Sequence, residues 1–154
     1  MSGTIVVGVD GSEPSRAALD WALGEARLGS AKLVAVHAWA FFPSVSSDPF
    51  PGAYGHVSVA TEEAYEALRL EAERLLESEI SVASQAHEGV EVELRAVEGR
   101  PAVVLLEAAR DADLLVLGTR GHGGFVGLLL GSVSQQCAHH TPCPLVIVPH
   151  AEPG

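Results

Sequence analysis

Five short apolar runs separated by longer segments are the feature that most constrains how this chain can fold. Most of these runs are apolar without alternation, and the first is also rich in β-branched residues, which is typical of strands buried on both faces of a sheet. The segments between them carry apolar residues at helical spacing, so crossover helices must join consecutive strands. This alternation predicts an α/β fold, a single-domain doubly wound parallel sheet with helices on both faces. The predicted strands are residues 4–9, 32–40, 90–97, 113–117 and 144–149.

Two of these runs have the pattern of an edge strand. In run 90–97, apolar residues alternate with charged ones, so one face of that strand is exposed. Run 144–149 begins and ends with Pro144 and Pro149, which cannot extend a ladder of backbone hydrogen bonds. We therefore expect both strands at the edges of the sheet.

Local signals mark the ends of the predicted helices. Ser12 is a candidate N-cap with Pro14 in the first turn, and Gly29 with Ser30 ends that helix. The longest predicted helix, residues 61–87, has one apolar face and one charged face, and such a charged face is ordinarily solvated. The two remaining helices are predicted at residues 102–110 and 133–140.

Residues 41–60 break the pattern, with three prolines, two glycines and four serines in one stretch. This composition predicts a loop, and its length exceeds that of most connections between elements. Such a loop is either a lid or partner surface, or an insertion without a function of its own, and the sequence leaves both open.

Length and charge narrow the class of protein. The 154 residues suit one domain, which we place at residues 1–150, with a short tail at residues 151–154. The net charge of −11 repels phosphate backbones, so we expect no nucleic acid and no membrane as a partner. No apolar run reaches the roughly 20 residues that span a bilayer, and the start has no basic or apolar leader. Two cysteines are too few for a disulfide framework, so we expect a cytoplasmic protein.

A glycine-rich segment links the predicted strand 113–117 to the helix that follows. It consists of Gly118-x-x-Gly121, nine further residues, and then Gly131-Ser132. At such a turn, backbone N–H groups and the positive end of a helix dipole converge, and glycines let an anion approach the backbone closely. Ser132 adds a hydroxyl that serves as a helix N-cap or as a phosphate donor. The segment therefore predicts a phosphate-binding turn.

This turn differs from better-known nucleotide motifs. No lysine follows Gly131, as a Walker A loop would require, and the turn after the first strand lacks the third glycine of the dinucleotide-binding fingerprint. The chain also has no Gly-x-Ser-x-Gly nucleophile elbow. If the first and fourth strands are neighbours at the point where strand order reverses, Asp10 and the glycine turn face one crevice.

The combination of these segments resembles the universal stress proteins, in the subgroup that binds ATP. The resemblance is carried by Gly118-x-x-Gly121, nine residues and Gly131-Ser132, continued by Val133-Ser134. It covers nearly the whole chain, with residues 41–60 as the variable part. The other matching stretches are residues 7–12, His37-Ala38, Gly99-Arg100-Pro101 and residues 143–149.

This resemblance implies a sheet of order 3-2-1-4-5, of the adenine nucleotide α-hydrolase-like type, with a site for ATP (or ADP or AMP) and Mg²⁺ on its phosphates. Asp10 would lie near the ribose and the metal, Ala38 would meet adenine through backbone groups, and residues 131–134 would bind phosphates. It also implies a homodimer paired through the last strand, Leu145 to Val148, and a protein partner that the sequence does not identify. The residues that the resemblance assigns to nucleotide binding are Gly8, Val9, Asp10, Ala38, Leu117, Gly118, Arg120, Gly121, Gly131, Ser132, Val133 and Ser134.

Several residues also have a plainer interpretation. Asp10 either lies at the metal or caps the turn before Ser12, and Arg120 either contacts phosphate or points to solvent. The segment Cys137-x-His139-His140-x-x-Cys143 contains metal-ligand residue types, but Cys137 lies on the core face of its helix. We interpret Cys137 as core, His37 as a satisfied histidine, His122 as solvent-exposed, and Trp21 and Trp39 as packing residues.

Two classes of function remain. The first is an ATP-binding stress-response protein that acts as a nucleotide-dependent regulator or adaptor. Its hydrolysis would be slow at most, because the sequence places no general base, acidic pair or lysine around the phosphates. The second is a Mg²⁺-dependent ATPase or nucleotidyl-transfer enzyme of a related fold, in which Asp10 holds the metal and Arg120 stabilises phosphate charge. In the adaptor version, ATP orders loop 41–60 for a protein partner.

Overall fold

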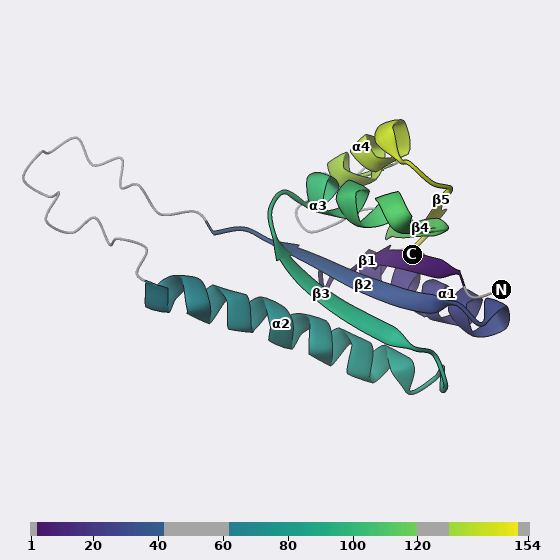
Figure 1. Cartoon of the computed structure of the whole chain (residues 1–154), viewed down its shortest axis with the longest axis horizontal. Helices are drawn as coiled ribbons and strands as arrows, with labels where there is room; N and C mark the ends of the chain where they lie inside the picture. The colour runs from purple at the N-terminus through teal and green to yellow at the C-terminus, as the bar shows by residue number, and fades with distance from the viewer. Residues whose placement is uncertain (1–2, 42–61, 120–129, 151–154) are drawn as a thin grey trace, which may run out of the picture.

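The strands form one parallel sheet in the order β3-β2-β1-β4-β5 (Figure 1). The computed structural model describes residues 3–41, 62–119 and 130–150. The doubly wound α/β fold and its strand order are confirmed, and the two runs predicted as edge strands are the edges β3 and β5. The strands are β1 Thr4–Gly8, β2 Lys32–Trp39, β3 Val92–Glu98, β4 Leu114–Gly118 and β5 Leu145–Val148.

The helices between the strands follow local signals in the sequence. At the start of α1, the Ser12 Oγ accepts a hydrogen bond from the Ser15 N–H at 3.3 Å, as expected of an N-cap. At its end, Ser30 has the left-handed conformation that closes many helices. The predicted end of α2, residue 87, was too late, because the helix ends at Ser84. The helices are α1 Glu13–Gly29, α2 Glu62–Ser84, α3 Pro101–Ala108, the short 3₁₀ turn η2 Ala109–Asp111, and α4 Ser132–His140.

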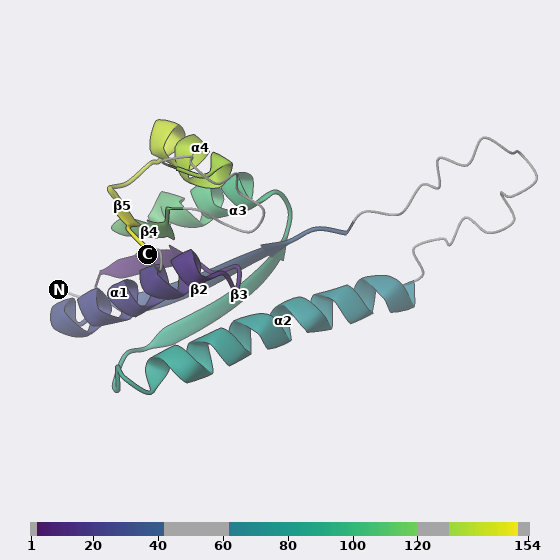
Figure 2. The same cartoon turned by 180° about the vertical axis from the view of Figure 1, so that it is seen from behind.

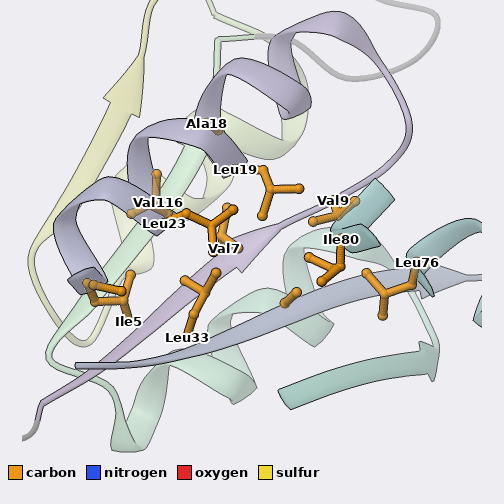
Figure 3. Packing of buried hydrophobic residues seen from close by; sticks show 13 residues of the cluster. Ile5, Val7, Val9, Ala18, Leu19, Leu23, Leu33, Leu76, Ile80 and Val116 are labelled. Carbon is orange, nitrogen blue, oxygen red and sulfur yellow. The ribbon is translucent and has the colours of Figure 1, made fainter. Parts of the chain in front are cut away.

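Helices α1 and α2 cover one face of the sheet, and α3 and α4 cover the other (Figures 1 and 2). In β1, Val7 packs on the α1 side and Val6 on the α3 side, and both are buried. Successive side chains of a strand point to opposite faces, so a strand covered on both faces must be apolar throughout. This explains the runs without alternation. Figure 3 shows the α1–α2 side of the core, where Leu19, Leu23 and Leu33 pack around Val7.

Helix α2 is held against the sheet mainly by its C-terminal half. Ala72, Leu76 and Ile80 are buried, whereas Leu68 on the same predicted apolar face is 38% exposed. The 23 residues of α2 span about 34 Å, and the eight residues of β2 span only about 26 Å, so the helix extends past the strand. Neither α2 nor any other helix in the described ranges is long and apolar enough to cross a membrane.

Glu93 of the edge strand β3 forms an ion pair with Lys32 of β2 and another with Arg95 of its own strand. Its carboxylate lies 2.5 Å from the Lys32 Nζ and 2.6 Å from the Arg95 Nε. Hydrogen bonds from Arg95 and Lys32 lower the pKa of Glu93 to about 2. Because this folded-state pKa lies below the unfolded-state value, the ion pairs stabilise the fold above the unfolded pKa of about 4.3. Their contribution is lost as the pH falls toward the folded-state pKa.

We expect Glu93→Gln to lower the free energy of unfolding at neutral pH by at most about 1 kcal/mol, because solvent screens a pair exposed to this degree. Thermal unfolding of both proteins across the acid range checks this. The difference in Tm should be constant above the unfolded pKa and should close as the pH approaches the folded-state pKa. A difference that persists unchanged in strong acid would mean that the ion pairs do not cause it.

Candidate functional site

Strands β1 and β4 are neighbours, and the strand order reverses between them. From β1, the sheet continues to β2 and β3 on one side and to β4 and β5 on the other. Residues 5–7 pair with residues 114–116, so the two strands end side by side. Asp10 follows β1 and Gly118 ends β4, so the structure brings these two predicted site residues to the same edge. Doubly wound sheets bind their ligands at this edge, outside the carboxyl ends of the strands.

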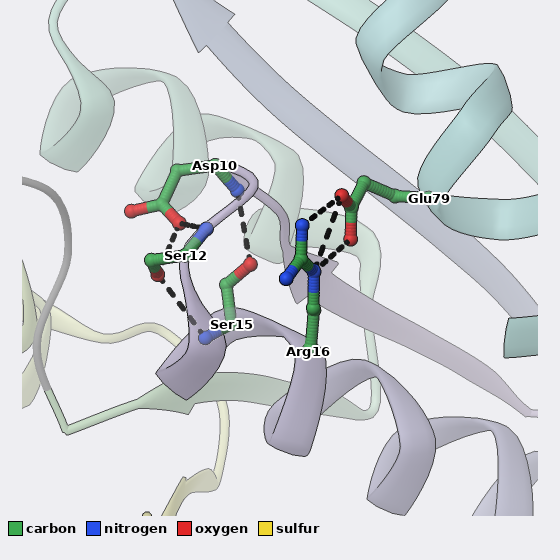
Figure 4. Close-up of polar contacts among 5 residues, drawn as sticks. All are labelled: Asp10, Ser12, Ser15, Arg16 and Glu79. Atoms are coloured by element: carbon green, nitrogen blue, oxygen red, sulfur yellow. Dashed lines mark hydrogen bonds and ion pairs between the residues drawn. The ribbon is translucent and has the colours of Figure 1, made fainter. Parts of the chain in front are cut away.

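The turn after β1 is fixed by hydrogen bonds among its own residues (Figure 4). The Asp10 Oδ1 accepts from the Ser12 N–H at 2.9 Å and from the Ser12 hydroxyl at 2.5 Å. The Asp10 N–H donates to the Ser15 Oγ at 3.2 Å. Gly11 has a φ of 82°, which a glycine adopts without strain. The turn-capping role of Asp10 is therefore present, and it holds the half-buried carboxylate at the end of β1.

The same close-up shows an ion pair that anchors the first turn of α1 to α2 (Figure 4). The Arg16 guanidinium donates to both carboxylate oxygens of Glu79, with its Nε 3.0 Å from Oε2. Most of the Arg16 side chain is exposed, whereas Glu79 is 14% exposed. A two-pronged contact of this kind fixes orientation as well as distance. It therefore helps to hold the start of α1, and the turn before it, in place.

The segment between β4 and α4 is closed at its base by two hydrogen bonds. The Gly131 N–H donates to the Thr119 carbonyl at 2.7 Å, so the chain returns to the point where it left the strand. The Ser134 hydroxyl donates to the Gly118 carbonyl at 2.7 Å, and this contact is buried. Together these bonds hold the first turn of α4 beside the end of β4.

Helix α4 begins one residue earlier than predicted, and its N-cap is Gly131 and not Ser132. The first helical bond runs from the Gln135 N–H to the Gly131 carbonyl at 3.0 Å. Helix geometry leaves the N–H groups of residues 132–134 without a partner inside the helix. Ser132 is exposed, and Ser134 is buried. The first turn of α4 therefore combines N–H donors with the positive end of a helix dipole at the edge between β1 and β4.

Packing requires a glycine at Gly118, whereas at Gly8 an added side chain would meet only the ends of leucine side chains. A Cβ at Gly118 would lie 2.6 Å from the carbonyl oxygen and 2.7 Å from the carbonyl carbon of Pro14, in the first turn of α1. A Cβ at Gly8 would lie 2.8 Å from a side-chain carbon of Leu117 and 3.2 Å from one of Leu105. From the sequence, Gly118 was expected to be a glycine because an anion approaches the backbone closely there. The structure shows that the protein's own atoms already require a glycine there.

The carboxyl end of β2 lies beside the end of β1. The Val9 N–H donates to the Val36 carbonyl at 2.8 Å, and the His37 Nδ1 lies 2.8 Å from the Val9 carbonyl oxygen. Because a carbonyl only accepts, the His37 Nδ1 carries the proton in this contact. His37 is thus a satisfied histidine, as predicted. Ala38, the predicted adenine contact, follows it and is half-buried.

The residues interpreted as packing or core residues have that role. Trp39 is 9% exposed, and its ring lies 5.2 Å from that of Tyr65, while Trp21 packs against the α1–α2 core. Cys137, on α4, is fully buried in the core on the α3–α4 side of the sheet, and burial raises the pKa of its thiol to about 11. Such a thiol remains protonated at neutral pH and is a poor metal ligand. In the part of the chain that the structure describes, no three His, Cys, Asp or Glu side chains gather as a metal site.

Sequence reasoning missed two supports of this edge, Ser15 and Pro14. Ser15 is 5% exposed and fixes the Asp10 N–H, and Pro14 lies against Gly118. The spacing Ser12-x-x-Ser15 after a strand is a signal that points to Ser15, whereas no local pattern predicts the contact of Pro14 with a residue so far along the chain. The predicted site residues Arg120 and Gly121, together with His122, lie outside the described residues, as does nearly all of loop 41–60.

The fold and the edge between β1 and β4 define a doubly wound α/β domain with the ligand-binding arrangement of that class. The sequence pattern described as "Universal stress protein family" matches residues 1–149. The chain belongs to the universal stress protein family, as the resemblance of its motifs indicated.

Known relatives cover the chain almost completely. A universal stress protein of Thermus aquaticus is 33% identical over 150 residues, which are 96% of this chain and 99% of that protein. A universal stress protein of Mycobacterium tuberculosis is 36% identical over 143 residues, but these are 93% of this chain and only 43% of that protein. The chain thus spans less than half the length of this mycobacterial relative. A solved universal stress protein in complex with cAMP is 30% identical, with a TM-score of 0.67, and the match covers 97% of this chain and 98% of that one.

Proposed function

We propose that this chain binds an adenine nucleotide, ATP with Mg²⁺ foremost, and acts in the cytoplasm as a nucleotide-dependent regulator or adaptor in stress response. The observation that carries the proposal is the convergence of three segments at the neighbouring carboxyl ends of β2, β1 and β4. These are the Asp10 turn, the end of β2, and the first turn of α4 held against Gly118. The relative solved with cAMP, similar over nearly the whole chain, supports a nucleotide as the ligand class.

The first turn of α4 would bind the phosphates. Its N–H groups and the helix dipole favour an anion, and the exposed Ser132 adds a hydroxyl. The net charge of −11 opposes an anion at long range, so these local donors must supply the attraction. The Ser134 hydroxyl is engaged by the Gly118 carbonyl, so Ser134 would contribute through its backbone. Arg120 and Gly121, from the glycine motif, would complete the phosphate path.

The Ala38 peptide groups would meet the adenine. The Val36 carbonyl bonds toward β1, and the Trp39 carbonyl accepts the Gly99 N–H on the β3 side. Because peptide groups alternate sides along a strand, the Ala38 N–H and carbonyl point to the β1 side, where Asp10, the residue opposite Ala38, already belongs to the turn. A donor beside an acceptor matches an adenine edge, where a ring nitrogen acceptor lies next to an amino donor. The bottom of this site would be lined by residues at the ends of β1 and β4, namely Gly8, Val9 and Leu117.

Asp10 would hold Mg²⁺ on the phosphates, and Asp10→Asn separates this role from its role in the turn. Asparagine keeps an oxygen for the Ser12 N–H and hydroxyl but removes the charge. We expect Asp10→Asn to keep its Tm and its affinity for ATP without metal, but to lose about tenfold in affinity for Mg²⁺–ATP. Calorimetric titration with and without Mg²⁺ checks this, and Asp10→Ala should also lower the Tm. If Mg²⁺ raises the ATP affinity of Asp10→Asn as much as that of the unaltered protein, Asp10 only caps the turn and does not hold the metal.

Release of nucleotide from the purified protein is the direct test of the proposed function. The protein is denatured, the supernatant is separated by chromatography, and adenine nucleotides are identified by mass spectrometry. A second sample, stripped of nucleotide, is titrated with ATP. We expect an adenine nucleotide in the first experiment or saturable binding in the second. Failure of both would overturn the proposal.

A turnover assay separates a regulator from the alternative, a Mg²⁺-dependent ATPase or nucleotidyl-transfer enzyme. Typical enzymes turn over between one and a thousand times a second. We propose the regulator, so phosphate release from Mg²⁺–ATP should stay below about one per minute, well under that range, and should be no faster than nucleotide exchange. Rates of about one per minute or faster would favour the enzyme.

We also propose that the chain forms a homodimer through β5. This strand is at the edge of the sheet, and its four residues, Leu145–Val148, are all half-buried and apolar. An apolar edge strand ordinarily needs a cover against unwanted pairing, and a second copy of the same strand supplies one. Light scattering should give twice the mass of the chain, and a monomer at micromolar concentration would rule out this interface.

A further inference from the structure

His37 stands where the backbone ladder between β1 and β2 would otherwise continue. Gly8 pairs with Val36, so Val9 lies opposite His37 in the register. In a parallel ladder at this position, the Val9 N–H bonds to the Val36 carbonyl, and the Val9 carbonyl accepts the N–H of Ala38. The first of these bonds is present at 2.8 Å. The second bond is not among the backbone hydrogen bonds of the described residues; at the Val9 carbonyl the His37 Nδ1 lies 2.8 Å away instead.

We propose that His37 is a positioning residue for recognition of the base. Its ring holds the Val9 carbonyl and thereby leaves the Ala38 N–H to the base of the bound nucleotide. This inference rests on the proposed function and names the residue on which its base selectivity depends. If the ladder bond formed instead, the sheet would use the Ala38 N–H, and the adenine would lose its backbone donor.

The same contact links the two sides of the site. His37 directly precedes Ala38, at the proposed base side, and Val9 directly precedes Asp10, at the proposed ribose and metal side. The Val9 N–H is bonded to Val36, so β2 holds Val9 through both its N–H and its carbonyl. The imidazole of His37 is therefore held between the end of β2 and the residue that follows β1. Its hydrogen bond also fixes the tautomer, with the proton on Nδ1.

Two substitutions test this role. His37→Phe keeps a ring but removes the donor, whereas the Asn side chain of His37→Asn can place an N–H near the position of the His37 Nδ1. We expect His37→Phe to lose about tenfold in affinity for ATP but little for GTP, so that its selectivity between the two bases falls. His37→Asn should restore most of that selectivity. An unchanged ratio of ATP to GTP affinity in a folded His37→Phe would overturn the proposal.

Hydrogen exchange in the unaltered protein gives a second test that does not depend on a variant. Measured residue by residue by NMR, the Ala38 amide should exchange rapidly without nucleotide, although its strand neighbours are protected. Addition of ATP should protect it, and addition of GTP should protect it less. If the Ala38 amide is as well protected as its neighbours before any nucleotide is added, the ladder bond exists and the proposal is wrong.

These outcomes are distinct from failure of the proposed function itself. If the unaltered protein neither releases nor takes up an adenine nucleotide, the proposed function fails, and the role of His37 in base recognition fails with it. If the protein binds ATP, and His37→Phe keeps the selectivity of the unaltered protein, only the role of His37 is overturned.

Discussion

Replacing Gly118 with alanine is expected to destabilise the chain by about 3 kcal/mol or more. The new Cβ would meet the backbone carbonyl of Pro14 at 2.6–2.7 Å, a distance that requires the backbone itself to shift. Gly118 is buried at the end of β4, and its carbonyl accepts the buried hydroxyl of Ser134, so a shift would also disturb the start of α4. For a domain of this size, we expect the Tm to fall by about 6–12 °C.

Gly29→Ala is the matched control for this prediction. Gly29 is the last residue of α1, and a Cβ there would meet no atom within 4 Å. The same added methyl group should therefore leave the Tm nearly unchanged, and it should raise it slightly if the loss of glycine reduces the freedom of the unfolded chain. Equal effects at the two positions, measured by thermal unfolding, would contradict the packing explanation of Gly118.

Because substitution of Gly118 is expected to destabilise the fold, loss of nucleotide binding in a Gly118 variant does not by itself identify a phosphate site. A bulky side chain at Gly118 that abolishes nucleotide binding would be consistent with a phosphate site, but the clash with Pro14 produces the same loss through the fold. A test of the phosphate site must therefore use a position at which the backbone tolerates the change.

The layout of the fold could be predicted because it depends on local patterns. Continuous apolar runs require cover on both faces, and helical segments between them require parallel crossovers, which already gives the doubly wound sheet. The two edge strands followed from alternation in β3 and from the prolines around β5. The full order of the strands, which brings Asp10 and Gly118 to the same edge, came from the resemblance to the universal stress proteins and not from local patterns.

The roles of individual atoms at the site could not be predicted, because they depend on contacts between distant segments. The resemblance assigns residues 131–134 to phosphate binding, but it does not show that the Ser134 hydroxyl donates to the Gly118 carbonyl. Gly118 was explained by a ligand, yet a glycine is required there by the contact with Pro14, which lies far earlier in the chain. His37 was predicted to be satisfied, but only the register of β1 and β2 shows that its partner is the Val9 carbonyl.

Replacing Ser132 with proline is expected to lower the affinity for ATP about 10- to 100-fold while leaving the fold intact. Ser132 is the first residue of α4, where proline is well tolerated because its missing N–H has no partner in the helix. Gly131 before it has φ −72° and ψ 167°, the extended conformation that a residue before proline prefers. The substitution thus removes one N–H and one hydroxyl from the proposed phosphate site without a change in backbone path.

Two controls make the result specific. Ser132→Ala removes the hydroxyl alone, so the difference between the two variants measures the backbone N–H. Glu13→Pro places proline at the first residue of α1, after Ser12 with ψ 160°, at the same edge but outside the proposed phosphate contacts. Calorimetric titration should show weakened binding in Ser132→Pro, a smaller loss in Ser132→Ala and little change in Glu13→Pro, with the Tm of all three near that of the unaltered protein. If Ser132→Pro binds ATP as tightly as the unaltered protein, the first turn of α4 is not the phosphate site.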